Sequence, residues 1–136
     1  MQTLIIGGGL FRLALADALQ AQSHDYMLVE ARDRFGGRIK TEHDGAGYFD
    51  MKPAWFWQGQ PRIAALIDRL GLETFDQFSS GNLGFEDETG QVQRGRGGAS
   101  MEGSLRFKGG LGALTQILAN GLPEARTSLN AQVIAV

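Results

Sequence analysis

Two glycines near the start of the sequence and one acidic residue further along have the types and spacing of a nucleotide-binding turn. Gly7 and Gly9 fit the first two positions of the pattern Gly-x-Gly-x-x-Gly, in which the first glycine permits a tight turn and the second lets a pyrophosphate approach the backbone. Glu30 follows roughly 20 residues later, where its carboxylate can accept hydrogen bonds from ribose hydroxyls. A carboxylate there disfavours a 2′-phosphate, so the spacing favours FAD or NAD over NADP.

Arg12 stands at the third position of this pattern, where glycine normally lets the helix lie close against the strand. If the arginine faces the sheet, the helix has to tilt or shift, at a cost of about 1–3 kcal/mol, as in an overpacked core. If it turns toward the ligand instead, its guanidinium can contact a phosphate. We expect a displaced helix or weakened binding, and the phosphate contact is the alternative.

The elements that would position these residues are a strand, a helix and a second strand. The apolar run Thr3–Ile6 is typical of a buried parallel strand, and the segment Leu10–Ala21 places apolar residues on one helical face. Residues Tyr26–Ala31 form a second strand-like run that contains Glu30 near its end. Together these segments predict a βαβ unit, with the phosphates at the N-terminus of its helix.

The remaining sequence alternates signals for hairpins and helices. Turn residues between short strand-like runs predict two hairpins, and periodic apolar residues followed by glycine predict two helices. The hairpins are expected within residues 39–51 and 83–95, and the helices within residues 61–72 and 109–123. Residues 129–136 predict a strong strand in which the sequence stops, so this strand either lacks its next element or is the buried last strand of a complete small domain.

The composition of the 136 residues excludes several classes of function. With 43% hydrophobic and 21% charged residues, the chain is expected to fold as about one globular domain. A net charge of −2 without a basic stripe argues against nucleic-acid and membrane binding, and the absence of cysteine excludes disulfides and thiolate chemistry. No apolar run is long enough to span a bilayer, and the first strand leaves no room for a signal peptide, so a cytoplasmic protein is expected.

The other ionisable residues give no sign of a metal or of a catalytic group. His24 and His43 are isolated, fall in predicted loops and lack the spacing of metal ligands. The acidic run Glu86–Glu88 falls at a predicted hairpin tip, where solvated charges are expected. We therefore predict no metal site and no catalytic residue within this chain.

Three further segments resemble the N-terminal portion of the flavin-containing amine oxidase family, the monoamine oxidase-like group. They are LVEARDRFGGRIKT at residues 28–41, YFDMKPAWFWQGQPRIAALIDRLGLETFDQF at 48–78 and GSLRFKGGLGALTQILANGL at 103–122. The resemblance implies an α/β fold: a Rossmann-like FAD-binding βαβ unit with inserted β-hairpins and helices, incomplete relative to the family. Residues 1–136 would be the N-terminal part of an FAD/NAD(P)-binding domain, with the βαβ unit at 3–31, an inserted segment at about 39–107, and a helix and strand at 109–136.

By this resemblance the cofactor is FAD, and its contacts come from short stretches spread along the chain. The residues expected to bind it are Gly7, Gly9, Glu30, Ala31, Arg32, Gly36, Gly37, Arg38, Ala54, Trp55 and Val133. Arg38 would neutralise phosphate charge, Trp55 would lie near the isoalloxazine ring, and Val133 would meet adenine through its backbone. Of the aromatic residues Trp55, Phe56 and Trp57, at least one is expected in the core instead.

The activity that the resemblance implies is the FAD-dependent oxidation of an amine to an imine, with the flavin as hydride acceptor. In the family the substrate domain comes from later sequence, so a small-molecule amine is expected as a partner only when a C-terminal half completes the chain. Arg12, and Lys52 where the family usually has a glycine beside the flavin, support an alternative: a non-catalytic truncated remnant or nucleotide-binding module. A third possibility is one subunit of a split oxidase, paired with a partner chain or in a homo-oligomer.

Overall fold

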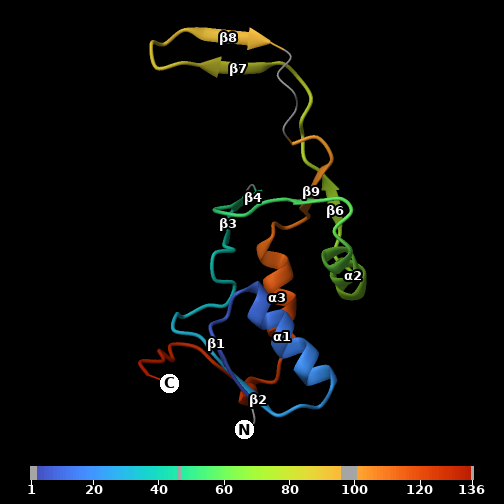
Figure 1. Cartoon of the computed structure of the whole chain (residues 1–136), viewed down its shortest axis with the longest axis vertical. Coiled ribbons are helices and arrows are strands. Elements are labelled where there is room, and N and C mark those ends of the chain that lie inside the picture. Colours follow the sequence, from blue (N-terminus) through green and yellow to red (C-terminus); the bar gives the residue numbers. More distant parts are fainter. Residues whose placement is uncertain (1–2, 46, 96–100, 136) are drawn as a thin grey trace.

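The computed structural model describes residues 3–45, 47–95 and 101–135. The molecule is elongated, with a body that carries the helices and a hairpin arm that extends from it (Figure 1). In chain order the elements are β1 (Thr3–Ile6), α1 (Leu10–Ala21), β2 (Tyr26–Val29), β3 (Thr41–Asp44), β4 (Gly47–Asp50), β5 (Phe56–Trp57), α2 (Pro61–Leu70), β6 (Thr74–Asp76), β7 (Leu83–Glu86), β8 (Val92–Gly95), β9 (Ser104–Phe107), α3 (Gly112–Asn120), a 3-10 turn (Glu124–Arg126) and β10 (Thr127–Ser128).

The first three elements form the βαβ unit that the sequence predicts. β1 and β2 pair in parallel, and β10 pairs in parallel on the other side of β2, so β2 is the central strand of a three-stranded sheet. The helix α1 crosses between β1 and β2 and buries Leu13 and Ala16. These two residues belong to the same core cluster as Ile5 and Leu28 of the strands. The helix therefore lies close against the sheet.

The end of the chain differs from its prediction. Residues 129–136 were expected to form a strand, but the paired strand is Thr127–Ser128 and residues 129–135 are irregular. Val136 lies outside the described residues. The reason is local: Asn130 has a φ of 55°, in the left-handed region that no strand residue adopts. The chain still follows the end of β2, because the backbone N–H of Ala131 donates to the Glu30 carbonyl at 2.9 Å.

The segment between β2 and α3 contains both predicted hairpins and the predicted α2. The β3–β4 and β7–β8 hairpins are antiparallel, and α2 begins at Pro61 and ends before Gly71, whose φ of 63° suits a glycine stop. A second sheet of three short strands, in the order β5-β9-β6, was not predicted. Its strands are two to four residues long and come from distant parts of the sequence. Such non-local pairs leave no periodic signal in any one window.

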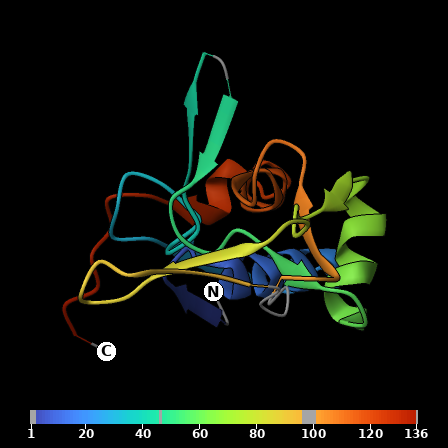
Figure 2. The same cartoon turned by 90° about the horizontal axis from the view of Figure 1, so that it is seen from above.

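Two of the helices and the second sheet share one core. The helices α1 and α3 lie side by side in both ribbon views (Figures 1 and 2), and α3 buries Leu114 and Leu118 beside Leu13 of α1. Phe107 of β9 is completely buried, and its ring lies 4.9 Å from that of Phe56 in β5, centroid to centroid. The inserted sheet is thus fixed to the same core as the βαβ unit.

Asp50 connects the β3–β4 hairpin to the start of α3. Its side chain is 1% exposed, and its Oδ1 accepts hydrogen bonds from the backbone N–H of Leu111 at 2.9 Å and from the Thr41 hydroxyl at 2.5 Å. The Thr41 Oγ1 in turn accepts from the backbone N–H of Gly112 at 2.8 Å, and Arg106 donates to the second Asp50 oxygen at 3.1 Å. A carboxylate at a helix N-terminus is favourable, so this network fixes where α3 begins.

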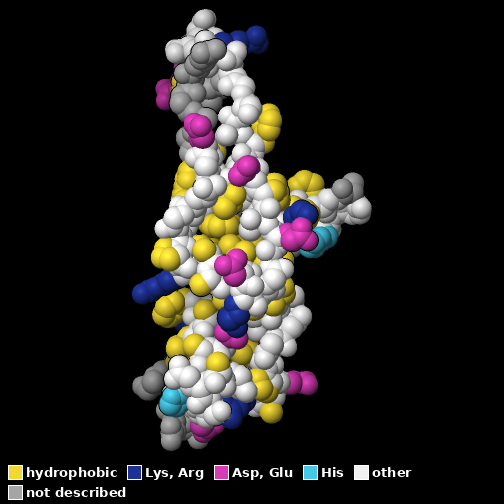
Figure 3. All heavy atoms as spheres, turned by 90° about the vertical axis from the view of Figure 1, so that its right-hand side faces the viewer, with side chains coloured by type: hydrophobic (Ala, Val, Ile, Leu, Met, Phe, Trp, Pro, Cys, Tyr) yellow, Lys and Arg dark blue, Asp and Glu magenta, His cyan; other side chains and the backbone are white. Residues whose placement is uncertain are grey.

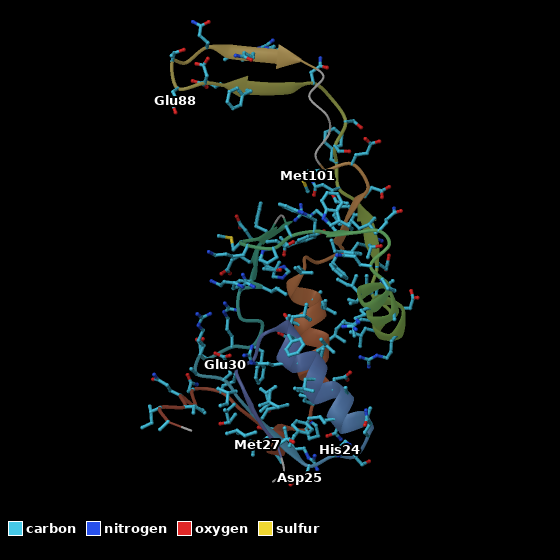
Figure 4. All side chains as sticks on the ribbon, in the orientation of Figure 1. His24, Asp25, Met27, Glu30, Glu88 and Met101 are labelled. Atoms are coloured by element: carbon cyan, nitrogen blue, oxygen red, sulfur yellow. The ribbon has the colours of Figure 1, made fainter. Side chains whose placement is uncertain are left out.

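The β7–β8 hairpin forms an arm beyond the body, with Glu88 at its tip (Figures 1 and 4). Phe85 in this arm is 58% exposed, and all four residues of β8 are exposed. In the space-filling view of the side that carries α2, hydrophobic side chains gather over the middle of the molecule and thin out toward the arm (Figure 3). Among the described residues, no helix has both the length and the apolar character needed to cross a membrane.

The shared core gives a test of the fold. We expect Phe107→Ala to lower the free energy of unfolding by about 3–5 kcal/mol, because it removes a fully buried aromatic ring and leaves a cavity. Phe78→Ala is the matched control: Phe78 is 80% exposed, so the same chemical change should alter stability by less than about 0.5 kcal/mol. Urea unfolding of both variants measures the difference, and equal effects would contradict the described core.

Candidate functional site

A cleft of about 830 Å³ opens between the start of α1 and the residues that follow β2 and β4. Part of its lining is glycine and charged residues from the two loops that follow β1 and β2. The other part is apolar and comes from α1, α2 and the segments before β5 and α3. The lining residues are Gly7, Gly8, Gly9, Leu10, Phe11, Arg12, Ala14, Glu30, Arg32, Gly36, Gly37, Arg38, Ile39, Pro53, Trp55, Phe56, Ile63, Leu66 and Leu111.

Two glycine turns pack against each other at the charged part of the cleft. The backbone N–H of Gly36 donates to the Gly8 carbonyl at 2.7 Å, and Gly9 and Gly36 form an isolated parallel bridge. A Cβ on Gly37 would stand 3.2 Å from the Cα of Gly9, so a side chain there would force the turns apart. The sequence stretches around residues 7–9 and 36–37 therefore form one surface.

Glu30 holds the same two turns together through its carboxylate. Its Oε2 accepts a hydrogen bond from the backbone N–H of Gly8 at 2.6 Å, and its Oε1 accepts one from the backbone N–H of Arg32 at 2.9 Å. The residue is 8% exposed and lies where β2 ends (Figure 4). Burial alone would raise the pKa of Glu30, but these two N–H donors and the nearby guanidinium groups of Arg32 and Arg34 outweigh it and hold the pKa below its ordinary value.

Gly8 and Arg34 also determine the geometry of the two turns, and neither was predicted from the sequence. A Cβ on Gly8 would stand 2.4 Å from a ring carbon of Phe35, so the second turn packs directly on this glycine. Arg34 donates from Nη2 to the Gly37 carbonyl at 2.9 Å and from Nη1 to the Ile39 carbonyl at 3.1 Å, which holds the second turn closed. The middle glycine of the triplet was a visible signal for Gly8, whereas nothing in the sequence separates Arg34 from its neighbours Arg32 and Arg38.

Arg12 takes the second of the two orientations left open by the sequence. Its side chain lies along the first glycine turn, with Cδ 3.2 Å and Nε 3.4 Å from the point where a Cβ on Gly7 would be. Arg12 is exposed and lines the cleft, while Leu13, the next residue, is fully buried under the helix. A displaced α1 was expected only for an Arg12 that faces the sheet, and the exposed side chain avoids the interface between helix and sheet.

Most of the predicted cofactor-binding residues lie around this one cleft. Those that line it are Gly7, Gly9, Glu30, Arg32, Gly36, Gly37, Arg38 and Trp55. Ala31, Ala54 and Val133 are not among the lining residues, and Val133 falls in the irregular segment after β10. Lys52 is exposed and also stands outside the lining, whereas Pro53 is part of it.

The aromatic residues after β4 divide between the cleft and the core. Trp55 is 47% exposed and lines the cleft, whereas Phe56 is buried and packs on Phe107. The prediction that at least one residue of this aromatic run belongs to the core is confirmed by Phe56. Its neighbour Trp57 is 41% exposed.

The described residues contain no cluster of three or more histidine or acidic side chains that could hold a metal ion. His24 lies in a loop as predicted, but His43 belongs to β3 rather than to a loop. Of the acidic run Glu86–Glu88, Asp87 and Glu88 lie in the β7–β8 turn as expected, and Glu86 is the last residue of β7.

Comparison with known proteins assigns the family. A family model described as flavin containing amine oxidoreductase matches residues 13–98, which is more than half of the chain. The chain belongs to this family. The match begins just after Arg12 and ends before residues 103–122, the third of the segments that resemble the family in sequence. The cofactor of the family is FAD.

Relatives within the flavin containing amine oxidoreductase family agree with this assignment. Putrescine oxidase from Kocuria rosea is 32% identical over 78 residues, which make up 57% of this chain and 16% of that protein. Amine oxidase [flavin-containing] A from Canis lupus familiaris is 40% identical over 75 residues, which make up 53% of this chain and 14% of that protein. This chain therefore spans only a small part of the length of the relatives it matches.

A solved structure confirms the fold class. A triple mutant of putrescine oxidase superposes with a TM-score of 0.83 over 96% of this chain and 51% of that one. The sequence identity is 17%, so this likeness concerns the fold alone. The predicted α/β fold with a partial Rossmann-like unit is confirmed.

The carboxylate of Glu30 gives a pH-dependent prediction. Glu30→Gln keeps the shape of the side chain but leaves one of two buried N–H groups without an acceptor, so it should destabilise the fold by about 1–3 kcal/mol near neutral pH. Because the folded-state pKa of Glu30 is lowered, the wild-type advantage is complete above its unfolded-state pKa of 4.5 and is lost as the pH falls through the folded-state value.

Urea unfolding of wild type and Glu30→Gln at about pH 7 and at several acidic values measures this advantage. Glu88→Gln at the exposed tip of the arm is the matched control, with an expected change below about 0.5 kcal/mol near neutral pH. An advantage of the wild type that grows on acidification would contradict the role given to the Glu30 carboxylate.

Proposed function

We propose that this cleft binds FAD. The main support is the open space beside Gly9 at the start of α1. Gly9 has an ordinary φ of −76°, and a Cβ placed on it would meet no atom of the described structure within 4 Å. Nothing in the protein itself therefore requires glycine at this position. A ligand that approaches the backbone at the start of α1 does require it, and a dinucleotide phosphate is such a ligand.

The residues around Gly9 fit the chemistry of a dinucleotide. No side chain caps the N-terminus of α1, and its first turn contains no acidic residue. The backbone N–H of Arg12 already donates to the Gly9 carbonyl, so an anion would be held by the N–H groups before Arg12 and by the positive end of the helix. Arg38 is exposed in the same lining and can neutralise phosphate charge. Each carboxylate oxygen of Glu30 accepts one N–H, which leaves acceptor capacity for ribose hydroxyls.

The apolar part of the lining suits the flat ring system of the flavin. Trp55 is about half exposed and can contact the ring. The rest of the apolar lining includes Phe56, Ile63, Leu66 and Leu111. Leu111 is held in place by its backbone N–H bond to Asp50. These residues would bind and orient the ring and keep water away from one side of it. When bound, FAD would supply the capacity to accept a hydride.

For the whole protein we propose the oxidation of an amine to an imine, with FAD as the hydride acceptor. Membership of the flavin containing amine oxidoreductase family supports this activity. Residues 1–136 would be the N-terminal part of the FAD-binding domain, and a C-terminal part would complete the amine site. Ala31, Ala54 and Val133 are then candidates for contacts that form only in the completed site.

A second candidate is a nucleotide-binding module that contributes no catalytic group of its own. Among the described lining residues, Glu30 is the only carboxylate, and no lysine or histidine is present. Both oxygens of Glu30 already accept backbone N–H bonds. Glu30 is therefore suited to stabilise the two turns and to bind ribose hydroxyls, and not to transfer a proton. This supports a chain that binds the cofactor while another polypeptide or segment supplies the amine site.

The proposal is tested by a substitution that the fold should tolerate and the ligand should not. We expect Gly9→Thr to lower FAD affinity at least 10-fold, because its side chain would stand in the space needed by the phosphates, while the unfolding midpoint stays the same since threonine caps helices about as well as glycine. Isothermal titration calorimetry with FAD and thermal unfolding measure the two effects.

Gly47→Thr is the matched control, because Gly47 in β4 also has open space at its Cβ position and does not line the cleft. It should leave FAD affinity unchanged. If the wild-type chain binds no FAD, or if Gly9→Thr binds it as tightly as wild type, the cleft is not the FAD site.

A further inference from the structure

The Arg12 side chain lies over the first glycine turn. Arg12 is the third residue of α1, and its side chain runs back across the turn so that Cζ, the central carbon of the guanidinium, is 3.8 Å from the Cβ position of Gly7. The guanidinium is thus on the cleft side of the turn, within the lining that also holds Gly9.

The position of Arg12 is unfavourable in the protein without an anion. Within residues 3–45, 47–95 and 101–135, its guanidinium forms no hydrogen bond or ion pair with another side chain or with the backbone. A cation in the first turn of a helix is repelled by the positive end of the helix dipole, and no acidic residue in that turn offsets it. An anion bound at the turn would make the position of Arg12 favourable, because the guanidinium and the positive end of the helix would then attract the same group.

The charges of the lining point to an anion with more than one negative charge. Arg12, Arg32 and Arg38 all line the cleft, and the one carboxylate among the described lining residues is Glu30. Two backbone N–H groups already bond to that carboxylate. A single phosphate would leave part of the positive charge of the three arginines uncompensated. A diphosphate offers charged oxygens to several donors at once.

We propose that Arg12 binds the diphosphate of the cofactor directly, so that this chain uses a guanidinium where the motif has a third glycine. The inference rests on the proposed FAD site and adds to it a residue that the motif does not supply. A charge-assisted contact from Arg12 adds to the N-terminus of α1 as a means of holding the phosphates. It also makes binding depend on the diphosphate more than on the adenosine or flavin portions.

Variants of Arg12 test this with ligand affinity rather than activity. We expect Arg12→Gln to lower the affinity for both ADP and FAD roughly 10- to 100-fold, the range of a charge-assisted hydrogen bond, and to weaken the salt dependence of binding. Arg12→Lys should lose less than Arg12→Gln, because it keeps the charge without the planar fork. Since Arg12 is exposed, neither variant should lower the unfolding midpoint.

Calorimetric titrations with ADP and with FAD at low and high salt measure these effects, and Arg94→Gln in the exposed strand β8 is the matched control with no expected change. A change below about threefold in Arg12→Gln, or tighter binding, overturns the inference on Arg12; tighter binding would mean that the side chain blocks the site. That result leaves the FAD site standing as long as the wild type binds FAD. Absence of FAD binding by the wild type overturns the proposed site itself.

Discussion

The buried carboxylate of Glu30 is the interaction on which the charged half of the cleft depends. It accepts backbone N–H bonds from the turn after β1 and from the loop after β2, and so fixes the distance between these two segments. Removing a carboxylate from water is costly unless its oxygens are satisfied. Here burial would raise the pKa of Glu30, but the two N–H donors on its oxygens, together with the nearby guanidinium groups, hold that pKa below its ordinary value. The two glycine turns can then pack at backbone distance.

Asp50 has the corresponding role for the apolar half. Its buried carboxylate joins the β3–β4 hairpin to the start of α3, and the N–H that it binds belongs to Leu111, a residue of the cleft wall. The cleft therefore lies between two parts of the backbone that are each held by one buried acid. The aromatic segment Trp55–Trp57 is held by Phe56, whose ring packs on Phe107 in the core, and Trp55 stays at the surface. The arm beyond the body has no such anchor among the described contacts and stays exposed.

Local patterns in the sequence predicted the elements that are stabilised locally. The bounds of α1 and the two hairpins follow from apolar periodicity and turn residues, and α2 follows from Pro61 and Gly71. The sheet β5-β9-β6 and the short β10 could not be predicted this way, because their stability comes from partners far away in the sequence.

In the site, too, local sequence patterns predicted some features, whereas others depend on residues brought together by folding. Glycine spacing and Glu30 identified the turn, and the resemblance to a family added the second turn. The direction of the Arg12 side chain depends on the three-dimensional path of the first turn, and the bonds of Arg34 depend on carbonyls that only the folded loop brings together. Neither depends on residue type alone.

The pairing of β10 with β2 has a consequence for the order in which the protein can form during synthesis. Arg126 donates to the carbonyl of His24 at 2.7 Å across 102 residues of sequence, and Ala131 binds the carbonyl of Glu30. Closing a loop of that length is entropically slow and has to precede the contacts that it permits. Until residues 126–131 have left the ribosome, the central strand β2 has one open edge. The backbone around Glu30 is thus completed only after a segment about 100 residues further along the chain has emerged.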